Sequence, residues 1–379
     1  MGRYFNPVES YFGVGELNRL GQILQSVSTP MQHILLITRG GNFAETAEHT
    51  ILMEQLKDKQ VQTLSVEIAN PDVEDLYALL QQTGGKKFDA IVALGGGSVL
   101  DLGKSMAACN HLTFQHVEEL RQAIISSSYL DNSHICPWVA IPTTAGTGSE
   151  VTPWATIWDR ANGIKYSVDG KPLFARFAII DPNLTLSLPV RTSIISGLDA
   201  ICHATEAYWS KSTNVISRQF ALEAIRLIVP NLAALYEDPT NVQLRTYVAQ
   251  GSFFAGLAFS NTKTTACHSI SYPITLLYGI DHGIAASMTL ASMMEWNKAE
   301  IIEIDKLVAA FGVKNVADVA DVIAAIYTKS GFSTRLRDYN VPQDGIVDIV
   351  ERAYTKGRMD NNPRAITKEQ LEQLLLTIY

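Results

Sequence analysis

The sequence is poor in cysteine, in charged residues and in long apolar runs, and each shortage narrows the kind of protein it encodes. Only four cysteines occur among 379 residues, and no two of them form a CxxC pair. The first residues, MGRYFNPVES, lack a charged segment followed by an apolar one, the arrangement typical of a secretory signal. No window reaches the roughly 18 uninterrupted apolar residues that a membrane helix needs. We therefore expect a cytoplasmic protein with no membrane segment.

The charge balance argues against nucleic acid as a partner. Lysine and arginine number 30 against 38 aspartate and glutamate residues, so the formal net charge is −8. Binding to a phosphate backbone needs a basic surface excess, which this composition does not supply. At 47% hydrophobic residues the chain is long enough for two domains with real cores. Small molecules are the expected partners.

The pattern of apolar residues predicts two domains of different class. Short β-rich runs alternate with helical ones in the first half, which is typical of a parallel sheet covered by helices. From Arg191 onward nearly every segment has the helical period. We predict an α/β domain over 1–188 and an all-α domain over 189–379, with Pro189 at the boundary. The expected strands are 33–38, 62–68, 88–98, 138–144 and 177–182.

A glycine-rich turn follows one of these strands in AIVALGGGSVLDLGKS. Glycines allow a ligand to approach the backbone, and the following helix offers free N–H groups to a pyrophosphate. Ser98 and Asp101 have the spacing of a capping box at the start of that helix. The Rossmann fingerprint needs glycine at Leu100 and the Walker fingerprint needs glycine at Ser98, so neither applies. The alternative is a plain tight turn.

A second loop of small residues, IPTTAGTGSEVT (141–152), follows another predicted strand. Its hydroxyl groups and glycines are suited to wrapping a nucleotide. Runs of serine, threonine and glycine are equally common in ordinary connections, so both interpretations stay open.

Asp199 and His203 are four residues apart on a helical pattern, so both side chains leave one face of the helix. His268 and His282 lie downstream on segments that proline and glycine separate, and they are expected to converge on the same point. One aspartate and three histidines would suit Fe(II) or Zn(II). The alternative is that these are core histidines with satisfied hydrogen bonds. Glu206 is interpreted as an acceptor that orients an imidazole, not as a ligand.

Together these segments resemble the iron-dependent alcohol dehydrogenases of the dehydroquinate synthase-like superfamily over essentially the whole chain. The resemblance implies an N-terminal dinucleotide-binding α/β domain, a C-terminal helical domain and an active site in the cleft between them. It is carried by ANPDVEDL (69–76), ALGGGSVLDLGK (93–104), IPTTAGTGSEVT, KYSV (165–168), IIDPNLTLSLP (179–189), GLDAICHATEAY (197–208) and the pair His268 and His282.

The resemblance also implies an activity and a set of site residues. The activity is metal-assisted hydride transfer between a nicotinamide cofactor and a small aldehyde or primary alcohol. The metal, with Fe(II) favoured over Zn(II), would be held by Asp199, His203, His268 and His282. The cofactor contacts would be Asn70, Gly96, Gly97, Ser98, Asp101, Thr143, Thr144, Thr147, Thr152, Lys165 and Leu184.

Arg39 bears on which nicotinamide cofactor is used. Relatives that prefer NAD place an acidic residue after the corresponding strand, whereas this chain has Arg39 followed by two glycines. An arginine can pair with the 2′-phosphate that an acidic residue would repel. We expect a preference for NADP(H) over NAD(H). The alternative is a solvated turn residue.

The chain departs from the family pattern at two positions. Tyr272 stands where many relatives have a further histidine supposed to assist proton transfer, so proton delivery by that histidine is in doubt.

Lys263 stands where relatives acting on simple alcohols have a small or apolar residue. A lysine in an apolar cleft predicts an anionic substrate end, unless it reaches solvent or pairs with a carboxylate such as Asp281. The run NTKTTACHSISYPI resembles the subgroup that reduces phosphonoacetaldehyde to 2-hydroxyethylphosphonate.

Other functions remain to be weighed against this one. Within the family, a general short-chain alcohol or aldehyde dehydrogenase of the butanol or propanediol type is the nearest alternative. Sister activities of the superfamily and a catalytically silent metal-binding protein are further ones. A metal-dependent hydrolase would use the same ligands but leave the two small-residue loops without a role. Relatives are usually homodimers or larger, so a homo-oligomer is expected.

Overall fold

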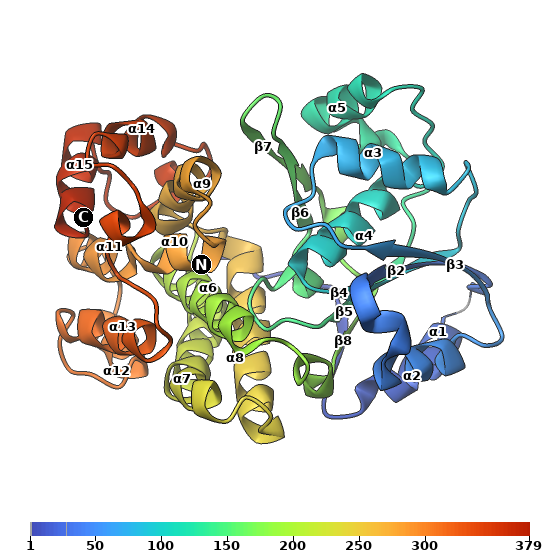
Figure 1. Cartoon of the computed structure of the whole chain (residues 1–379), viewed down its shortest axis with the longest axis horizontal. Helices are drawn as coiled ribbons and strands as arrows, with labels where there is room; N and C mark the ends of the chain where they lie inside the picture. Colours follow the sequence, from blue (N-terminus) through green and yellow to red (C-terminus); the bar gives the residue numbers. More distant parts are fainter. Residues whose placement is uncertain (1, 28) are drawn as a thin grey trace. The chain divides into compact units, whose positions relative to one another are not determined.

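The computed structural model describes residues 2–27 and 29–379, and the chain forms two compact units (Figure 1). One unit consists of 7–144 and 149–185. The other consists of the residues up to Asn6, the short segment 145–148 and everything from Leu186 onward. The first unit contains a parallel sheet with helices, and the second is mostly helical, which confirms the predicted fold class.

The sheet of the α/β unit has six parallel strands in the order β1-β8-β5-β4-β2-β3. The chain runs from β2 outward to β3 and then crosses back to β4 on the other side of β2. Parallel strands pair this way because each connection carries a crossover that packs on a face of the sheet. The strands are β1 (Glu9–Phe12), β2 (His33–Arg39), β3 (Gln60–Val66), β4 (Ala90–Gly95), β5 (Trp138–Pro142) and β8 (Phe177–Ile180).

Apolar residues cover both faces of this sheet. In β2, Ile34 and Leu36 face one core, whereas Leu35 and Ile37 face the other. Figure 1 shows α3, α4 and α5 on one face of the sheet and α1 and α2 on the opposite face. Strands buried on both faces have continuous apolar runs, which explains why the sequence pattern predicted them. The helices are α1 (Leu20–Gln25), α2 (Ala47–Gln55), α3 (Val73–Gln82), α4 (Gly97–Cys109) and α5 (Val117–Ser126).

All five predicted strands are present, but three further strands were not predicted. β1 is a four-residue strand at the edge of the sheet. β6 (Trp154–Asp159) and β7 (Ile164–Asp169) form a separate antiparallel hairpin. They were missed because all three lie outside the alternation of strand and crossover helix that identified the others.

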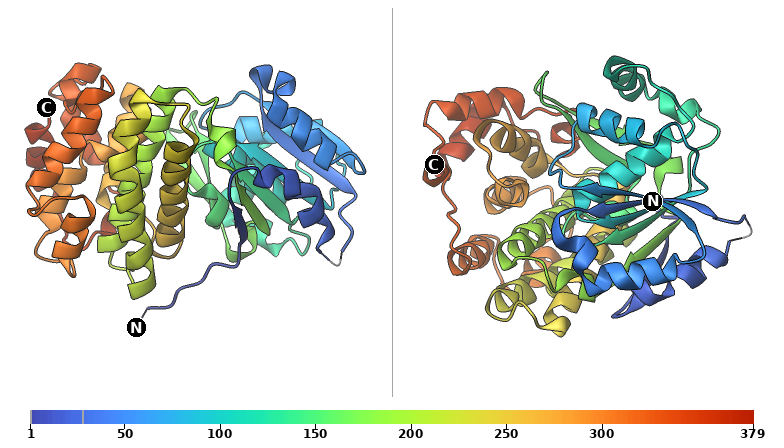
Figure 2. Two further views of the ribbon diagram at one scale, coloured as in Figure 1. Left: turned by 90° about the horizontal axis from the view of Figure 1, so that it is seen from below. Right: turned by 45° about the vertical axis from the view of Figure 1, so that its right-hand side comes forward.

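The helical unit is built around three long helices that pack side by side, α6, α7 and α8 (Figure 2). Among the residues that the structure describes, none of the helices has both the length and the apolar character to cross a membrane. The helices are α6 (Val190–Trp209), α7 (Val215–Glu237), α8 (Val242–Thr262), α9 (Ala266–Tyr278), α10 (His282–Ser287), α11 (Leu290–Asn297), α12 (Ile304–Ala310), α13 (Asp318–Lys329), α14 (Gly345–Arg352) and α15 (Lys368–Thr377).

The separation of His268 from His282 onto different elements is confirmed, and the break lies at Gly279. This residue ends α9 in the left-handed conformation, with φ of 67°, and α10 begins at His282. Pro273 lies inside α9 and does not end it.

The capping box predicted at Ser98 and Asp101 is wrong. Helix α4 begins after Gly96 without a side-chain cap. Asp101 instead accepts hydrogen bonds from the Ser149 hydroxyl at 2.7 Å and the Thr156 amide at 2.9 Å. These partners lie far along the chain, so they do not enter a local capping pattern.

A buried lysine holds the same distant segment against α4. The ammonium of Lys104 donates to the carbonyl of Ser149 at 3.0 Å, to the hydroxyl of Thr152 at 3.4 Å and to the carbonyl of Trp154 at 2.6 Å. Burial lowers the pKa of Lys104 to about 8, and the charges of Asp101 and Glu150 partly oppose this. Lys104 and Asp101 together fix residues 149–156 on the helix that follows the glycine turn.

Replacing Glu150 with glutamine is expected to remove a pH-dependent loss of stability. Burial raises the pKa of Glu150 from 4.5 to about 7, so between these values the folded chain keeps a proton that the unfolded chain releases. The free energy of unfolding of the parent therefore falls as the pH rises across this interval, by on the order of 1–3 kcal/mol. Urea unfolding at several pH values measures this fall, which should be smaller in Glu150→Gln.

The matched control is Glu45→Gln, which removes an exposed carboxylate of the same unit. It should keep the pH profile of the parent. A Glu150→Gln profile parallel to that of the parent would contradict the assignment.

Candidate active site

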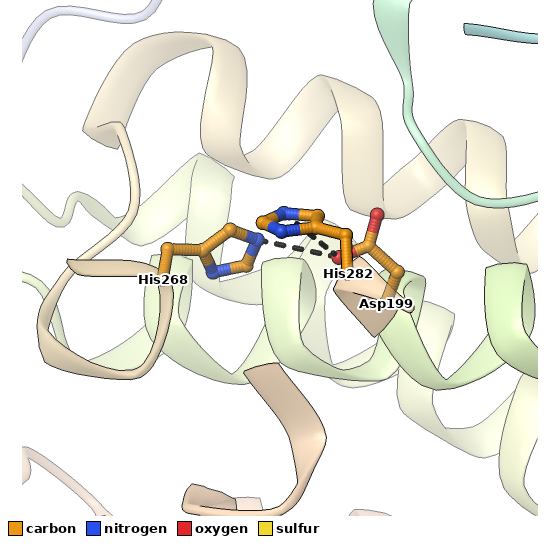
Figure 3. Close-up of side chains that lie close together, drawn as sticks. All are labelled: Asp199, His268 and His282. Carbon is orange, nitrogen blue, oxygen red and sulfur yellow. Dashed lines mark ion pairs between the residues drawn. The ribbon is translucent and has the colours of Figure 1, made fainter. Parts of the chain in front are cut away.

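Three predicted metal ligands meet inside the helical unit (Figure 3). Asp199 comes from α6, His268 from α9 and His282 from α10. One side-chain donor atom from each lies within 4.8 Å of the other two. The Nε2 atoms of His268 and His282 lie 3.3 Å and 3.9 Å from Oδ1 of Asp199. Two imidazoles and a carboxylate thus face a common point.

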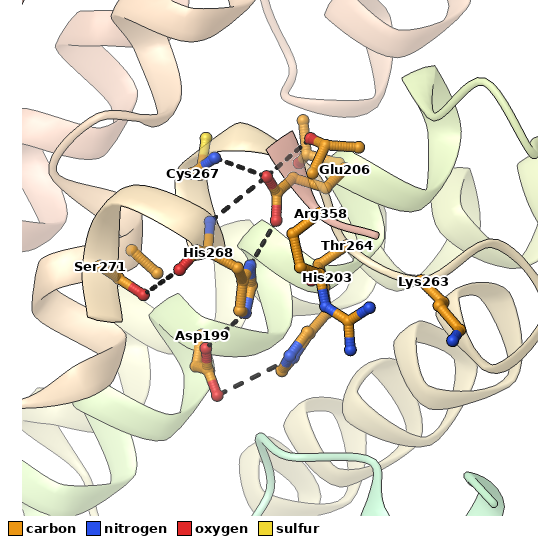
Figure 4. A network of polar contacts seen from close by, with 12 residues as sticks. Asp199, His203, Glu206, Lys263, Thr264, Cys267, His268, Ser271 and Arg358 are labelled. Carbon is orange, nitrogen blue, oxygen red and sulfur yellow. Dashed lines mark hydrogen bonds and ion pairs between the residues drawn. The ribbon is translucent and has the colours of Figure 1, made fainter. Parts of the chain in front are cut away.

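Glu206 fixes the orientation of His268 (Figure 4). It lies on α6 and is fully buried. Its Oε2 accepts a short hydrogen bond from Nδ1 of His268, and its Oε1 accepts from the amide of Cys267 at 2.7 Å and from the hydroxyl of Thr265 at 2.7 Å. The carboxylate therefore occupies the N-terminal end of α9, where free N–H groups and the helix dipole favour a negative charge.

The protonation of the group follows from these contacts. Burial alone would raise the pKa of Asp199, but the neighbouring imidazoles of His203, His268 and His282 hold that pKa well below its usual value. Burial alone would lower the pKa of His268, but Glu206 and Asp199 raise it to about 10. Both carboxylates are therefore ionised at neutral pH, which favours a bound cation.

His203 lies beside this group but is not part of it. Its ring is stacked between Phe259 and His268, with centroids 4.1 Å and 4.4 Å away. Its Nδ1 lies 3.2 Å from the carbonyl of Gly146 and 3.8 Å from Asp199. Burial lowers the pKa of His203 to about 4, so the ring is neutral. A hydrogen bond from Nδ1 to Gly146 leaves Nε2 as the atom available to a ligand.

The donor set fits a divalent metal ion. Oδ1 of Asp199 and Nε2 of His268 are buried and have no hydrogen-bond partner in the described structure, although each is a strong polar atom. Buried polar atoms without partners are rare in folded proteins and call for an explanation. Nitrogen and carboxylate oxygen donors suit Fe(II) or Zn(II), and a carboxylate on the far ring nitrogen of His268 is the usual support for such a ligand.

Of the two departures from the family pattern, Tyr272 contacts this group and Lys263 lies on the segment that precedes α9. Tyr272 is buried on α9 one turn beyond His268, and its ring stacks on His282 with centroids 5.9 Å apart. Lys263 ends α8 with φ of 58° and ψ of 179°, a conformation that essentially only glycine adopts without strain. Asp281, considered as a partner of Lys263, instead lies 3.1 Å from Arg191.

The predicted cofactor residues of the α/β unit gather at one edge of its sheet. Arg39, Gly96 and Thr143 follow the carboxyl ends of β2, β4 and β5. The strand order reverses between β2 and β4, and ligands of open parallel sheets bind outside the carboxyl ends of the strands at this switch point. A Cβ atom on Gly96 would lie 3.2 Å from the methyl group of Thr144, so the two loops approach closely there.

Asn70 lies at the same edge and is held by two side chains. Its amide donates to the hydroxyl of Ser98 at 3.1 Å, and its φ of 52° is in the left-handed region. Arg160, in the turn between β6 and β7, donates to the carbonyl of Asn70 at 2.7 Å and to Asp72 at 2.7 Å. The sequence carries no local signal for Arg160, because the contact joins segments about ninety residues apart.

The remaining predicted cofactor residues lie on several different segments. Thr152 is tied to Lys104, Lys165 lies on β7 opposite Trp158, and Leu184 is buried in the core below β8. Thr147 belongs to the short segment 145–148 that is grouped with the helical unit.

Arg39 is close to an acidic residue. Its guanidinium lies over the ring of Phe43, 5.2 Å from the centroid. Glu67, just after β3, accepts a short hydrogen bond from the amide of Gly41 in the same loop. A cation and a carboxylate are therefore both present in the loop that the sequence analysis expects to decide between the two nicotinamide cofactors.

Comparison with known proteins assigns the chain to one family. The model described as "Iron-containing alcohol dehydrogenase" matches residues 7–182, and the model described as "Fe-containing alcohol dehydrogenase family, C-terminal" matches residues 193–379. The two matches together cover nearly the whole chain.

Individual relatives act on different substrates. A phosphonoacetaldehyde reductase of Streptomyces viridochromogenes is 31% identical over 80% of this chain and 79% of its own length. An NADPH-dependent butanol dehydrogenase of Clostridium saccharobutylicum is 26% identical over 100% of this chain and 98% of its own. The crystal structure of a sulfoacetaldehyde reductase from Bifidobacterium kashiwanohense in complex with NAD+ superposes with a TM-score of 0.89 at 29% identity, covering 100% of this chain and 98% of that one.

These matches agree with the parallel sheet, the helical second unit and the cluster of Asp199, His268 and His282. They decide against the metal-dependent hydrolase and the silent binding protein as alternatives. The chain belongs to the iron-containing alcohol dehydrogenase family and is an oxidoreductase acting on aldehydes or alcohols.

Proposed function

We propose that this enzyme reduces a small aldehyde with an anionic end, with phosphonoacetaldehyde as the substrate and 2-hydroxyethylphosphonate as the product. The observation that carries the catalytic part is the pair of unpartnered buried atoms on Asp199 and His268, which face His282. The relatives named for phosphonoacetaldehyde and sulfoacetaldehyde support the charged substrate. NADP(H) is the proposed cofactor and the cytoplasm the proposed location.

Asp199, His203, His268 and His282 would hold the metal, with Fe(II) first and Zn(II) second by donor type. When bound, the metal would polarise the aldehyde oxygen and the nicotinamide would supply the hydride. Gly96, Gly97 and Ser98 at the start of α4 would take the pyrophosphate, since helix N-terminal amides bind anions.

The side chains of this chain have separate tasks in that reaction. Glu206 holds the Nδ1 proton of His268, so that Nε2 is the ring nitrogen that a metal ion would bind. Tyr272 lies parallel to His282 and provides a phenolic hydroxyl for proton transfer to the product oxygen. Lys263 provides a positive charge at the start of the α8 to α9 connection for the anionic end of the substrate.

A second candidate is a general short-chain aldehyde or alcohol dehydrogenase. The relationship to the butanol dehydrogenase extends over the full chain, although at 26% identity. The two candidates use the same metal and cofactor residues. They differ in whether the positive charge of Lys263 contributes to substrate binding.

Replacing Glu206 with glutamine is expected to weaken metal binding by about 10- to 100-fold, because the amide supports His268 less well than the carboxylate. Competition with a chromophoric chelator under anaerobic conditions measures the affinity. Glu223→Gln, on the exposed side of α7, is the control and should bind metal as the parent does. Unchanged affinity in Glu206→Gln, with normal unfolding, would contradict the role of Glu206.

Replacing Lys263 with alanine should raise KM for phosphonoacetaldehyde by about tenfold or more, the equivalent of about 1.4 kcal/mol of lost attraction. KM for butanal should change little, because that aldehyde carries no charge. Steady-state kinetics with both aldehydes provide the measurement. A parallel loss on the two substrates would favour the general dehydrogenase.

Replacing Arg39 with aspartate tests the cofactor preference. The parent is expected to use NADPH more efficiently than NADH, and the variant to reverse that order by about tenfold or more in kcat/KM, since a carboxylate repels the 2′-phosphate. Glu67→Gln, which removes the neighbouring carboxylate, should increase the NADPH preference. Equal efficiencies with both cofactors, unaffected by Arg39→Asp, would reject the assignment.

A further inference from the structure

Arg358 lies in a segment that is bonded to α9 at one end and to the α8 to α9 connection at the other. Before it, the Thr355 amide donates to the hydroxyl of Ser269 at 3.0 Å, one residue past His268. After it, the side-chain amide of Asn361 donates to the carbonyls of Thr262 and Thr264 at 2.8 Å and 3.0 Å. The two carbonyls flank Lys263. Residues 355–361 are therefore held beside the segment that carries Lys263 and His268.

The guanidinium of Arg358 is half-buried and makes little use of its donors. Its one hydrogen bond runs from Nη1 to the carbonyl of the preceding Gly357 at 3.1 Å, and it forms no ion pair within the described residues. By comparison, the buried Arg245 donates to three acceptors. A guanidinium offers five N–H groups, and withdrawing it from water without acceptors is costly.

Figure 4 shows the direction in which this side chain extends. The guanidinium of Arg358 leaves its segment toward the side of the network on which His203 lies, whereas Lys263 stands apart on the neighbouring segment. His203 is in turn stacked on His268. The guanidinium of Arg358 is thus directed to the side of the candidate metal ligands, and its segment is bonded on both sides of Lys263.

From this arrangement we infer that Arg358 binds the anionic end of the substrate, with Lys263 as the second cation. The ligand class is a tetrahedral oxyanion, phosphonate or sulfonate, on a short aldehyde. The planar fork of an arginine matches two oxygens of such a group, whereas a lysine supplies a point charge. The inference rests on the proposed function and adds a specificity residue to it.

The strained backbone at Lys263 agrees with this role. Its φ of 58° with ψ of 179° is a strained conformation for a residue other than glycine. Such strain is found where the surrounding structure enforces it, and it is common at ligand sites.

The test compares Arg358→Gln and Arg358→Lys with the control Lys356→Ala, which removes an exposed positive charge two residues away. The substrates are phosphonoacetaldehyde, sulfoacetaldehyde and uncharged propanal, assayed with the metal-loaded enzyme and NADPH. Arg358→Gln should lower kcat/KM for the preferred anionic aldehyde by about 30-fold or more and change propanal by less than about threefold. Arg358→Lys should recover part of the loss, and Lys356→Ala should resemble the parent.

A binding measurement separates this inference from the proposed function. Calorimetric titration with ethylphosphonate and with ethanesulfonate should show binding to the parent and to Lys356→Ala, weakened by about 30-fold or more in Arg358→Gln. This result would support the anion site even if no aldehyde were reduced, in which case the proposed function would fail alone. Equal losses on propanal and the anionic aldehydes, or unchanged binding of both anions by Arg358→Gln, would overturn the inference while leaving aldehyde reduction intact.

Discussion

The contact on which the candidate site depends is the hydrogen bond between the buried carboxylate of Glu206 and Nδ1 of His268. The same carboxylate accepts the first amides of α9, so it fixes both where that helix begins and how the imidazole is turned. Withdrawing a carboxylate from water is costly unless its oxygens are satisfied, and here the hydroxyl of Thr265 completes the set. The geometry of the ligands and the start of α9 therefore cannot vary independently.

The sequence was sufficient for features that repeat along the chain or lie on one helix. Buried strands and amphipathic helices follow from the period of apolar residues, and Asp199 and His203 follow from spacing on α6. It was insufficient where two distant segments determine the result. Asp101 resembles a capping residue locally, yet Ser149 and Thr156 take both of its oxygens. Arg358 stands in no motif, and only the bonds of Asn361 show that it lies near Lys263.

The α/β unit also uses charged side chains to hold its loops in place. Lys104 and Asp101 hold residues 149–156 against α4, and Arg160 holds Asn70 beside Ser98. Each is an interaction between a charged side chain and polar groups of a loop, not between two charges alone. Loops fixed in this way need little reordering when a ligand arrives, which lowers the entropic cost of binding.

The conformation of Lys263 has an evolutionary consequence. A glycine at this position would relieve the backbone strain and stabilise the fold. The single substitution Lys263→Gly is therefore enough to reach the more stable state. Natural selection does not maximise stability, and residues kept at such a cost mark places where another property is favoured. Under the proposed role of Lys263, a lineage that no longer bound an anionic substrate would lose the selection for lysine, and glycine would then be the more stable choice at this site.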